Sequence, residues 1–278
     1  MRSGKWTRRS KWSWRVVKER AGYAWLMNAA GRSCRPLFSP QRYWNQVEPS
    51  AVQNALREVF TRWGRPERLR VDNGAPWGSK GDWPTDLALW LIGMDIVMIW
   101  NPARRPQDNG VVERSQGTGK RWVEPRACPD TAELQGRLDK MDRIQREDYP
   151  SRSDSRWQAF PGLREVARPY SRAWEKRHWD MAKILAHMAD YTALRRVDSK
   201  GQVSIYGRNH YVGKPRHGQD IYVSLDPIER EWIFSTIQGV QLRHKVAEEI
   251  TRDRILKLQV TNRRDVATGS CGKTLCRY

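Results

Sequence analysis

Apolar side chains recur at helical spacing in the stretch that follows Pro49. Ser50 and Gln53 fit a capping box at its start, and Gly64 fits a stop at its end. The positions that share one helical face are Val52, Ala55, Leu56, Val59, Phe60 and Trp63. This pattern predicts an amphipathic helix over residues 50–64.

The pattern beyond this helix alternates between strand and helix periods. Residues 67–72 alternate polar with apolar and end at an acid, which predicts a short strand. Residues 85–93 are largely apolar and predict a helix, and residues 95–100 predict a buried strand. A further helix is predicted from about Val111. Helices that alternate with strands favour an α/β fold with helices on the faces of a sheet.

Flanking segments extend this core. Upstream, three weaker apolar segments predict a meander of strands, over residues 12–17, 23–27 and 34–38. Downstream, Asp130 and Glu133 fit the cap of a helix that runs to about Gln145. Apolar positions at helical spacing over residues 174–188 predict one more helix.

The period changes to two from Ala193 onward. Short alternating segments are joined by turns at Gly207-Arg208-Asn209 and Gln238-Gly239, which predicts a small β-barrel. The final segment, from about Thr251 to Tyr278, has little apolar pattern after Val260, and we expect it to be a frayed tail. The predicted organisation is a basic arm (1–11), an α/β core (12–150), a linker and helix (151–193), a small β-barrel (194–245) and a C-terminal tail (246–278).

The charge balance narrows the class of partner. The chain has 278 residues, with 51 Lys and Arg against 31 Asp and Glu, for a formal net charge of +20. Residues 1–45 carry eleven of the cations and the single acid Glu19. An excess of this size predicts a partner that is a polyanion, most simply a nucleic acid.

Other features exclude several classes. No apolar run approaches the ~20 residues of a membrane span, and no signal-peptide pattern opens the chain. Four cysteines without a Cys-x-x-Cys pair and five scattered histidines argue against a disulfide framework and a zinc site. We therefore expect a soluble, cytoplasmic protein with no membrane partner.

Two acids stand out because of their position in these elements. Asp72 ends the predicted strand, and Glu113 lies in the first turn of the helix predicted from Val111. Carboxylates at a strand end and a helix start can converge at one edge of a sheet and share Mg²⁺ or Mn²⁺ ions. Taken singly, each acid also has a structural explanation, as a turn residue or as a partner of the helix dipole.

The residues around these acids form a two-part motif. The first part is Arg70-Val71-Asp72-Asn73-Gly74-Ala75-Pro76-Trp77, and the second joins Asn101-Pro102 to Pro106-Gln107-Asp108-Asn109-Gly110-Val111-Val112-Glu113-Arg114. Together they resemble the catalytic core of DDE transposases and retroviral-type integrases, within the bacterial insertion-sequence group. The resemblance covers about residues 38–121, and the predicted barrel is similar to the small β domain that follows the core in Mu-type transposases. It implies an RNase H-like integrase core, a mixed sheet flanked by helices.

The resemblance implies a role for each matching position. Asp72 and Glu113 match the second and third carboxylates that hold two catalytic Mg²⁺ or Mn²⁺ ions. Asn73 matches the turn beside the metal, and Asn109 matches the loop that presents the DNA end. Residues that share a helical face with Glu113 are expected to contact the DNA backbone, namely Gln116 and Lys120. For Lys120 an ordinary solvated lysine is an equal alternative.

The motif departs from the family at its first acid. The nearest match to the first-strand motif is Trp12-Ser13-Trp14-Arg15, which puts Arg15 where the first catalytic Asp belongs. A guanidinium has no acceptor atom and repels a metal ion. Three explanations remain open, namely an inactive chain, a first strand located elsewhere, or an N-terminal part read in a shifted frame.

The resemblance implies DNA transposition or integration by metal-dependent phosphoryl transfer. The partners it implies are element ends and target DNA, bound by a homo-oligomer close to the bacterial nucleoid. Two alternatives remain beside this expectation. One is an inactive DNA-binding remnant, and the other is a nuclease on the same fold.

Overall fold

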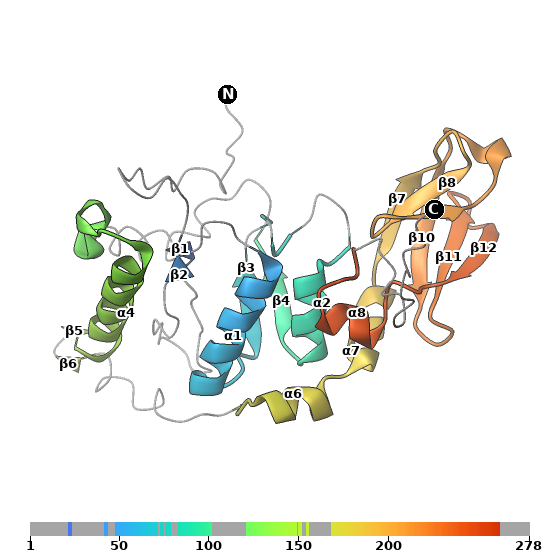
Figure 1. The fold of residues 1–278 in the computed structure, drawn as a ribbon. Coiled ribbons are helices and arrows are strands. Elements are labelled where there is room, and N and C mark those ends of the chain that lie inside the picture. Colours follow the sequence, from blue (N-terminus) through green and yellow to red (C-terminus); the bar gives the residue numbers. More distant parts are fainter. Residues whose placement is uncertain are drawn as a thin grey trace, which may run out of the picture. The chain divides into compact units, whose positions relative to one another are not determined.

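The chain is a mixed α/β protein that divides into two compact units, residues 1–191 and 192–278. Their division falls just before the predicted start of the barrel at position 194. Figure 1 shows the elements in chain order, as they lie in a computed structural model. The structure describes residues 22–23, 42–43, 48–71, 73–74, 76–78, 83–101, 121–148, 150–151, 154–155 and 168–261.

The first unit is built around a parallel pair of strands. The register of β3 and β4 runs from Arg68 opposite Val97 to Val71 opposite Trp100. The chain crosses from β3 to β4 through α2, as a parallel connection requires. The bounds are α1 Pro49–Trp63, β3 Arg68–Val71, α2 Asp86–Gly93 and β4 Val97–Trp100. The helices and strands predicted over this stretch are therefore confirmed.

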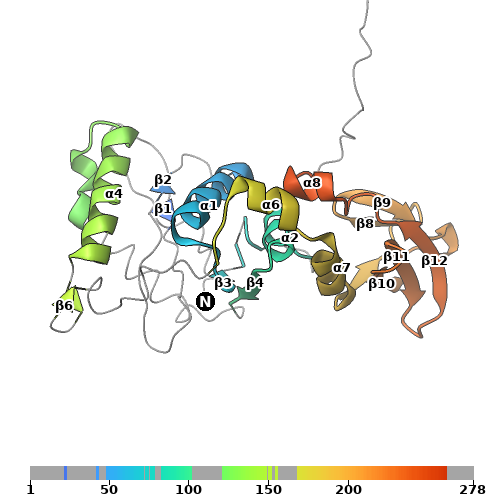
Figure 2. The same cartoon turned by 90° about the horizontal axis from the view of Figure 1, so that it is seen from below.

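Helices α1 and α2 lie beside each other along this strand pair, as Figure 2 shows. The ring of Phe60 in α1 stacks on that of Trp90 in α2, with centroids 6.4 Å apart. Both side chains are fully buried. The apolar face predicted for the first helix is thus the face that packs, since its apolar positions from Val52 to Phe60 are buried.

Two local predictions in this stretch are wrong. The helix begins at Pro49, after Glu48, and no side chain caps it, so Ser50 and Gln53 form no capping box. Proline at the first helical position needs no partner for its nitrogen, which makes the earlier start favourable. The β4 strand is not fully buried, because Val97 is 57% exposed while Met98 is buried.

The segment before α4 folds onto that helix. The N-cap Asp130 accepts a hydrogen bond from the Glu133 backbone N–H at 2.8 Å, which confirms the predicted cap. A small apolar cluster forms from Val123, Cys128, Leu134, Leu138 and Met141. The bounds here are η3 Pro125–Ala127 and α4 Thr131–Glu147.

Four two-residue strands complete the described part of this unit. They pair antiparallel as β1 with β2 and β5 with β6. Most of the meander predicted over residues 12–38 lies outside the described residues, as does the start of the helix predicted from Val111. The bounds are β1 Gly22–Tyr23, β2 Arg42–Tyr43, β5 Pro150–Ser151 and β6 Asp154–Ser155.

The single helix predicted over residues 174–188 is two helices. They are α6 Arg172–His178 and α7 Met181–Ala189, separated by Trp179 in an extended conformation. Asp180 caps α7 by accepting a hydrogen bond from the Ala182 backbone N–H at 2.8 Å. The buried Trp179 indole donates to the Trp90 carbonyl oxygen at 3.0 Å. The break therefore turns Trp179 onto α2 within the first unit.

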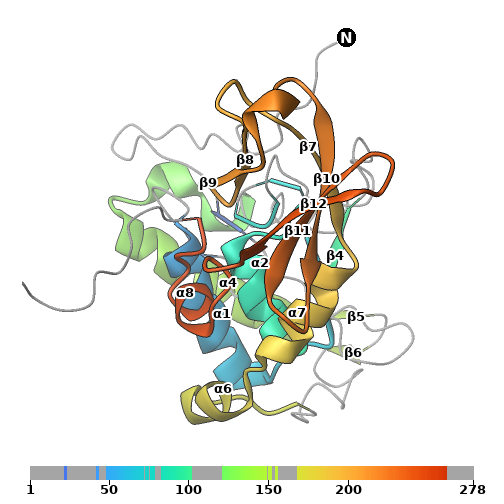
Figure 3. The same ribbon diagram turned by 90° about the vertical axis from the view of Figure 1, so that its right-hand side faces the viewer.

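The second unit is an antiparallel sheet with a separate hairpin, as Figure 3 shows. The sheet order is β12-β11-β10-β7, and its core face carries Ile221, Val223, Leu225, Trp232 and Phe234. No closed barrel forms among the described residues, where β8 and β9 pair only with each other. The bounds are β7 Thr192–Arg196, β8 Gln202–Ile205, β9 Arg208–Tyr211, η5 Lys214–Arg216, β10 Asp220–Asp226, β11 Glu231–Thr236, β12 Gln241–Val246 and α8 Arg252–Leu256.

Two predictions in this unit are corrected. The β8–β9 turn is Tyr206-Gly207, with φ of 47° and 78°, one residue earlier than the predicted turn. Positive φ at both positions suits the twist of a two-residue hairpin. The expected fraying from Thr251 is wrong up to Thr261, because α8 forms there and the side chains of Ile255 and Val260 are buried. Residues 262–278 lie outside the described residues.

Candidate functional site

Of the residues predicted to bind metal or DNA, only Asn73 is among those that the structure describes. The predicted metal ligands Asp72 and Glu113 lie outside the described residues. The same holds for Arg15 and for the predicted DNA contacts, Asn109, Gln116 and Lys120. The described part of the candidate site is the edge of the sheet where β3 and β4 end.

The carboxyl ends of β3 and β4 meet at this edge because the strands are parallel. The Asn101 backbone N–H donates to the Val71 carbonyl oxygen at 2.9 Å, which extends the strand pairing by one residue. The Asn73 side-chain amide donates to the Asn101 carbonyl oxygen at 2.8 Å. We call Val71, Asn73, Trp100 and Asn101 the β3–β4 edge.

The turn that follows β3 is braced from both sides. The backbone N–H groups of Trp77 and Gly78 donate to the Gly74 carbonyl oxygen at 3.0 and 2.9 Å. The Trp100 indole donates to the Trp77 carbonyl oxygen at 3.2 Å. A Cβ atom at Gly78 would lie 2.3 Å from the Asn73 carbonyl oxygen, so this turn requires glycine there.

The start of α2 holds the same turn. The Thr85 hydroxyl lies 3.0 Å from the Pro76 carbonyl oxygen and 3.2 Å from that of Trp77. It also caps α2 by accepting a hydrogen bond from the Ala88 backbone N–H. The chain next to Asp72 is therefore tied to α2 as well as to β4.

An aromatic layer from α7 covers β4 at this edge. His187 stacks on Trp100 with centroids 6.5 Å apart, and Tyr191 lies 5.1 Å from His187. Trp83 extends the layer at 6.2 Å from Tyr191. Burial lowers the pKa of His187, although Asp190 opposes the shift, so the stacked ring is neutral at pH 7. This layer joins α7 to the strand that ends at Asn101.

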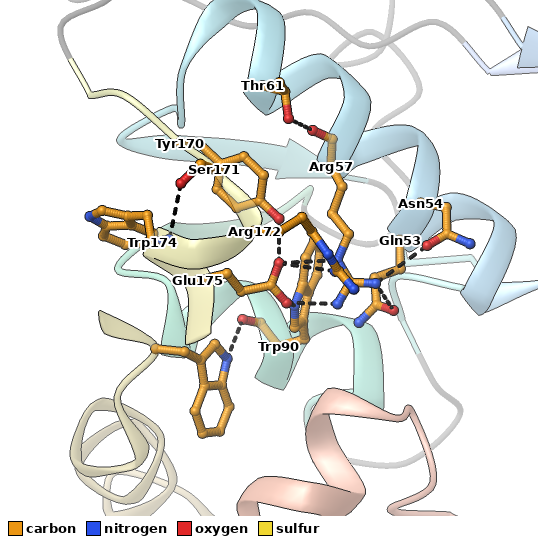
Figure 4. Close-up of polar contacts among 11 residues, drawn as sticks. Gln53, Asn54, Arg57, Thr61, Trp90, Tyr170, Ser171, Arg172, Trp174 and Glu175 are labelled. Carbon is orange, nitrogen blue, oxygen red and sulfur yellow. Dashed lines mark hydrogen bonds and ion pairs between the residues drawn. The ribbon is translucent and has the colours of Figure 1, made fainter. Parts of the chain in front are cut away.

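A buried carboxylate joins the helices behind the edge. Glu175 on α6 accepts hydrogen bonds from Arg57 on α1, from the Trp90 indole on α2 and from the Tyr170 hydroxyl, as Figure 4 shows. Burial would raise the pKa of Glu175, but the hydrogen bonds from Arg57, Tyr170 and Trp90 outweigh it and lower the pKa. Its oxygens are occupied by protein donors, so its role is to hold α1, α2 and α6 together.

The sequence did not indicate the contacts that support this edge. His187 and Trp100 belong to elements far apart in the chain, and no local period links them.

Among the described residues, no group of three His, Cys, Asp or Glu side chains is placed to hold a metal ion. No helix in that part of the chain combines the length and apolar character of a membrane span. No protein-family model matches the chain.

Proposed function

We propose that the chain is a DNA transposase or integrase of the DDE type, a metal-dependent polynucleotidyl transferase. The observation that carries this proposal is the hydrogen bond between Asn73 and Asn101, which ties together the segments following two parallel strands. In sequence, Asn73 directly follows Asp72 in the motif's first part. Ligand sites of open α/β sheets lie outside the carboxyl ends of the strands, which is the edge that this bond closes.

The proposal includes the finer fold. The first unit, with its parallel strands and flanking helices, would be an RNase H-like core, and the second would be a small β-barrel domain. The α1–β3–α2–β4 order supports the first assignment. The hairpin and the four-stranded sheet supply the strands that the second assignment needs.

The proposed chemistry uses carboxylates as metal ligands. Asp72 and Glu113 would hold Mg²⁺ or Mn²⁺ ions, since oxygen ligands without His or Cys suit these hard cations. When bound, such a metal pair activates water or a 3′-hydroxyl and stabilises the leaving oxygen of a phosphodiester. Asn73, through its bond to Asn101, would fix the backbone on which Asp72 stands. Asn109, Gln116 and Lys120 would contact the DNA.

The first acid of the triad is missing from the proposed site. Arg15 occupies the position of that acid in the motif, and a guanidinium cannot bind a metal ion. We therefore propose a degenerate copy of an active element, in which Arg15 replaces the first Asp. The alternative of an inactive DNA-binding remnant is favoured by the same substitution, and a nuclease would share the fold.

The proposed partners are element ends and target DNA, bound by a homo-oligomer in the cytoplasm near the nucleoid. The net charge of +20 supports a polyanionic partner. Binding that rests on phosphate contacts weakens steeply as salt rises.

The deciding experiment compares the wild-type chain with Arg15→Asp, each with and without Asp72→Asn. Mn²⁺ binding is measured by calorimetry, and joining is measured with pre-cut duplex ends taken from the DNA that flanks the gene. We expect Arg15→Asp to gain Mn²⁺ affinity and end joining, and Asp72→Asn to abolish both. Glu113→Gln is expected to match Asp72→Asn.

Each other outcome assigns a different function. Cleavage without joining would identify a nuclease. DNA binding by all four proteins, with neither Mn²⁺ binding nor cleavage by any, would overturn the proposal and leave the inactive remnant. Joining by the wild-type chain that Arg15→Asp leaves unchanged would refute the assignment of Arg15 alone.

A further inference from the structure

Asp95, which follows the C-cap of α2, forms ion pairs with two cations from other parts of the chain. Its carboxylate lies 2.5 Å from the Lys183 ammonium on α7 and 2.9 Å from the Arg168 guanidinium. Asp95 has a left-handed backbone with φ of 65° and is 60% exposed. The pKa of Asp95 is lowered, chiefly by the hydrogen bond from Lys183.

A third cation, Arg65, belongs to the same cluster. Its guanidinium donates to the Met94 carbonyl oxygen at 2.6 Å and lies over the Trp174 ring, 3.5 Å from the centroid. Burial lowers the pKa of Arg65 to about 10, and repulsion by Arg168 adds to this shift. Arg65 and Arg168 are therefore close enough to repel each other.

These four residues, Arg65, Asp95, Arg168 and Lys183, form what we call the Asp95 cluster. The cluster holds three cations and one carboxylate, of which Arg168 and Lys183 pair with the carboxylate, so its formal net charge is +2 at pH 7. Lys183 is 40% exposed and Arg168 is 21% exposed, so the cluster faces solvent. An ion pair open to water is weak, and Lys183 can exchange Asp95 for another anion at little cost.

The positive charge continues along α6. Trp174 carries Arg65 over its ring and stacks on His178 with centroids 5.0 Å apart. The last turn of this helix carries three basic residues, Lys176, Arg177 and His178. Trp174 thus contacts Arg65 of the cluster on one side and His178 of this basic turn on the other.

We propose that the Asp95 cluster is a contact surface for the phosphate backbone of DNA. Its residues lie on α7 and on the segments that follow α1, follow α2 and precede α6, and none of them belongs to the β3–β4 edge. The guanidinium of Arg168 is held in place by the carbonyl oxygens of Pro66 and Asp95, so little side-chain freedom is lost on binding. Lys183 supplies the mobile charge. The inference rests on the proposed function for the identity of the polyanion.

The alternative is that the cluster only ties the segment before α6 to α2. The two roles predict opposite signs for one substitution. Asp95 competes with phosphate for Lys183 and Arg168, so Asp95→Asn should strengthen DNA binding if the cluster contacts phosphate. A purely structural role would make Asp95→Asn and Lys183→Gln weaken binding together.

The test measures binding of a labelled random-sequence duplex by fluorescence anisotropy across a range of salt. The proteins are the full-length wild type, Lys183→Gln, Asp95→Asn and the control Lys200→Gln, which removes an exposed lysine in the second unit. We expect Lys183→Gln to weaken binding on the order of fivefold and to reduce the salt slope by about 1. We expect Asp95→Asn to bind more tightly than wild type at low salt, and Lys200→Gln to match wild type.

Circular dichroism checks that each variant is folded. If wild type binds DNA and Lys183→Gln binds equally well, or if Asp95→Asn also weakens binding, the inference is overturned while the proposed function stands. A loss of DNA affinity in Lys200→Gln equal to that in Lys183→Gln would overturn the inference too, because the effect would then not be specific to the Asp95 cluster. If the folded wild type binds no DNA at any salt, both fail.

Discussion

Arg57 and Glu175 form a two-point ion pair between α1 and α6. Arg57 donates from Nε and Nη2 to the two oxygens of Glu175, at 3.1 and 2.6 Å. The side chains are only 13% and 5% exposed. Because Trp90 and Tyr170 also donate to this carboxylate, donors from three parts of the first unit meet at one buried acid.

Glu175→Gln should destabilise the first unit strongly. The substitution keeps the size of the side chain but leaves the Arg57 charge buried without its partner. Breaking a buried pair in this way costs about 3–5 kcal/mol. Urea unfolding measures the loss. The matched control is Glu133→Gln, which breaks the exposed pair with Arg137 and should change the unfolding free energy far less than Glu175→Gln does. Equal losses in the two variants would contradict the role given to Glu175.

The stabilisation by Glu175 should depend on pH. Its pKa in the folded chain is lowered from the ordinary value of 4.5, so the unfolded state binds the proton more readily. The stabilisation is therefore complete above about pH 4.5 and is lost as the pH falls through the lower folded pKa. The difference in unfolding free energy between wild type and Glu175→Gln should shrink in acid. A difference that grows below pH 4.5 would mean that the folded pKa is raised instead.

Gly93→Ala tests the contact that breaks the α6–α7 segment. A Cβ atom at Gly93 would lie 2.3 Å from the Trp179 indole, which is buried and held by its bond to Trp90. Overpacking of this kind costs about 1–3 kcal/mol. The control is Gly136→Ala in α4, where a Cβ atom meets nothing within 4 Å. That change should stabilise the helix by about 0.5–1 kcal/mol. Thermal unfolding of both variants measures the change in stability relative to wild type. We expect a loss for Gly93→Ala and a gain for Gly136→Ala, and a change in the same direction for both would refute the packing argument.

The sequence predicts the elements whose signals are local. The helix ending at Trp63 follows from apolar spacing, and the cap at Asp130 follows from the residue type. The break at Trp179 could not be predicted, because its cause is a carbonyl oxygen on Trp90, 89 residues away. Without that contact, residues 174–188 have the pattern of one continuous helix.

The sequence motif predicts which residues form the turn at the candidate site, but it does not predict the contacts that hold this turn. The sequence indicates that Asn73 belongs to the turn after β3, and this residue does lie at the β3–β4 edge. It gives no sign that Thr85 and Trp100 brace the same turn. Their hydrogen bonds are made to backbone carbonyl oxygens. Because every residue carries such an oxygen, the residue types do not indicate which residue is the acceptor.

Asn73→Ala should loosen the turn beside the proposed site without unfolding the chain. It removes the bond to the Asn101 carbonyl oxygen at an exposed position, which contributes about 1 kcal/mol, so local opening should rise about fivefold. The measurement is hydrogen exchange of the Trp77 and Gly78 amides, which donate to Gly74. Trp100→Phe should act alike on these amides, because it keeps a ring against His187 but loses the indole donor to Trp77. The Val223 amide in the second unit is the internal control and should exchange as in wild type. If exchange at Trp77 stays unchanged in both variants, the two bonds do not hold the turn, and the positioning role proposed for Asn73 is refuted.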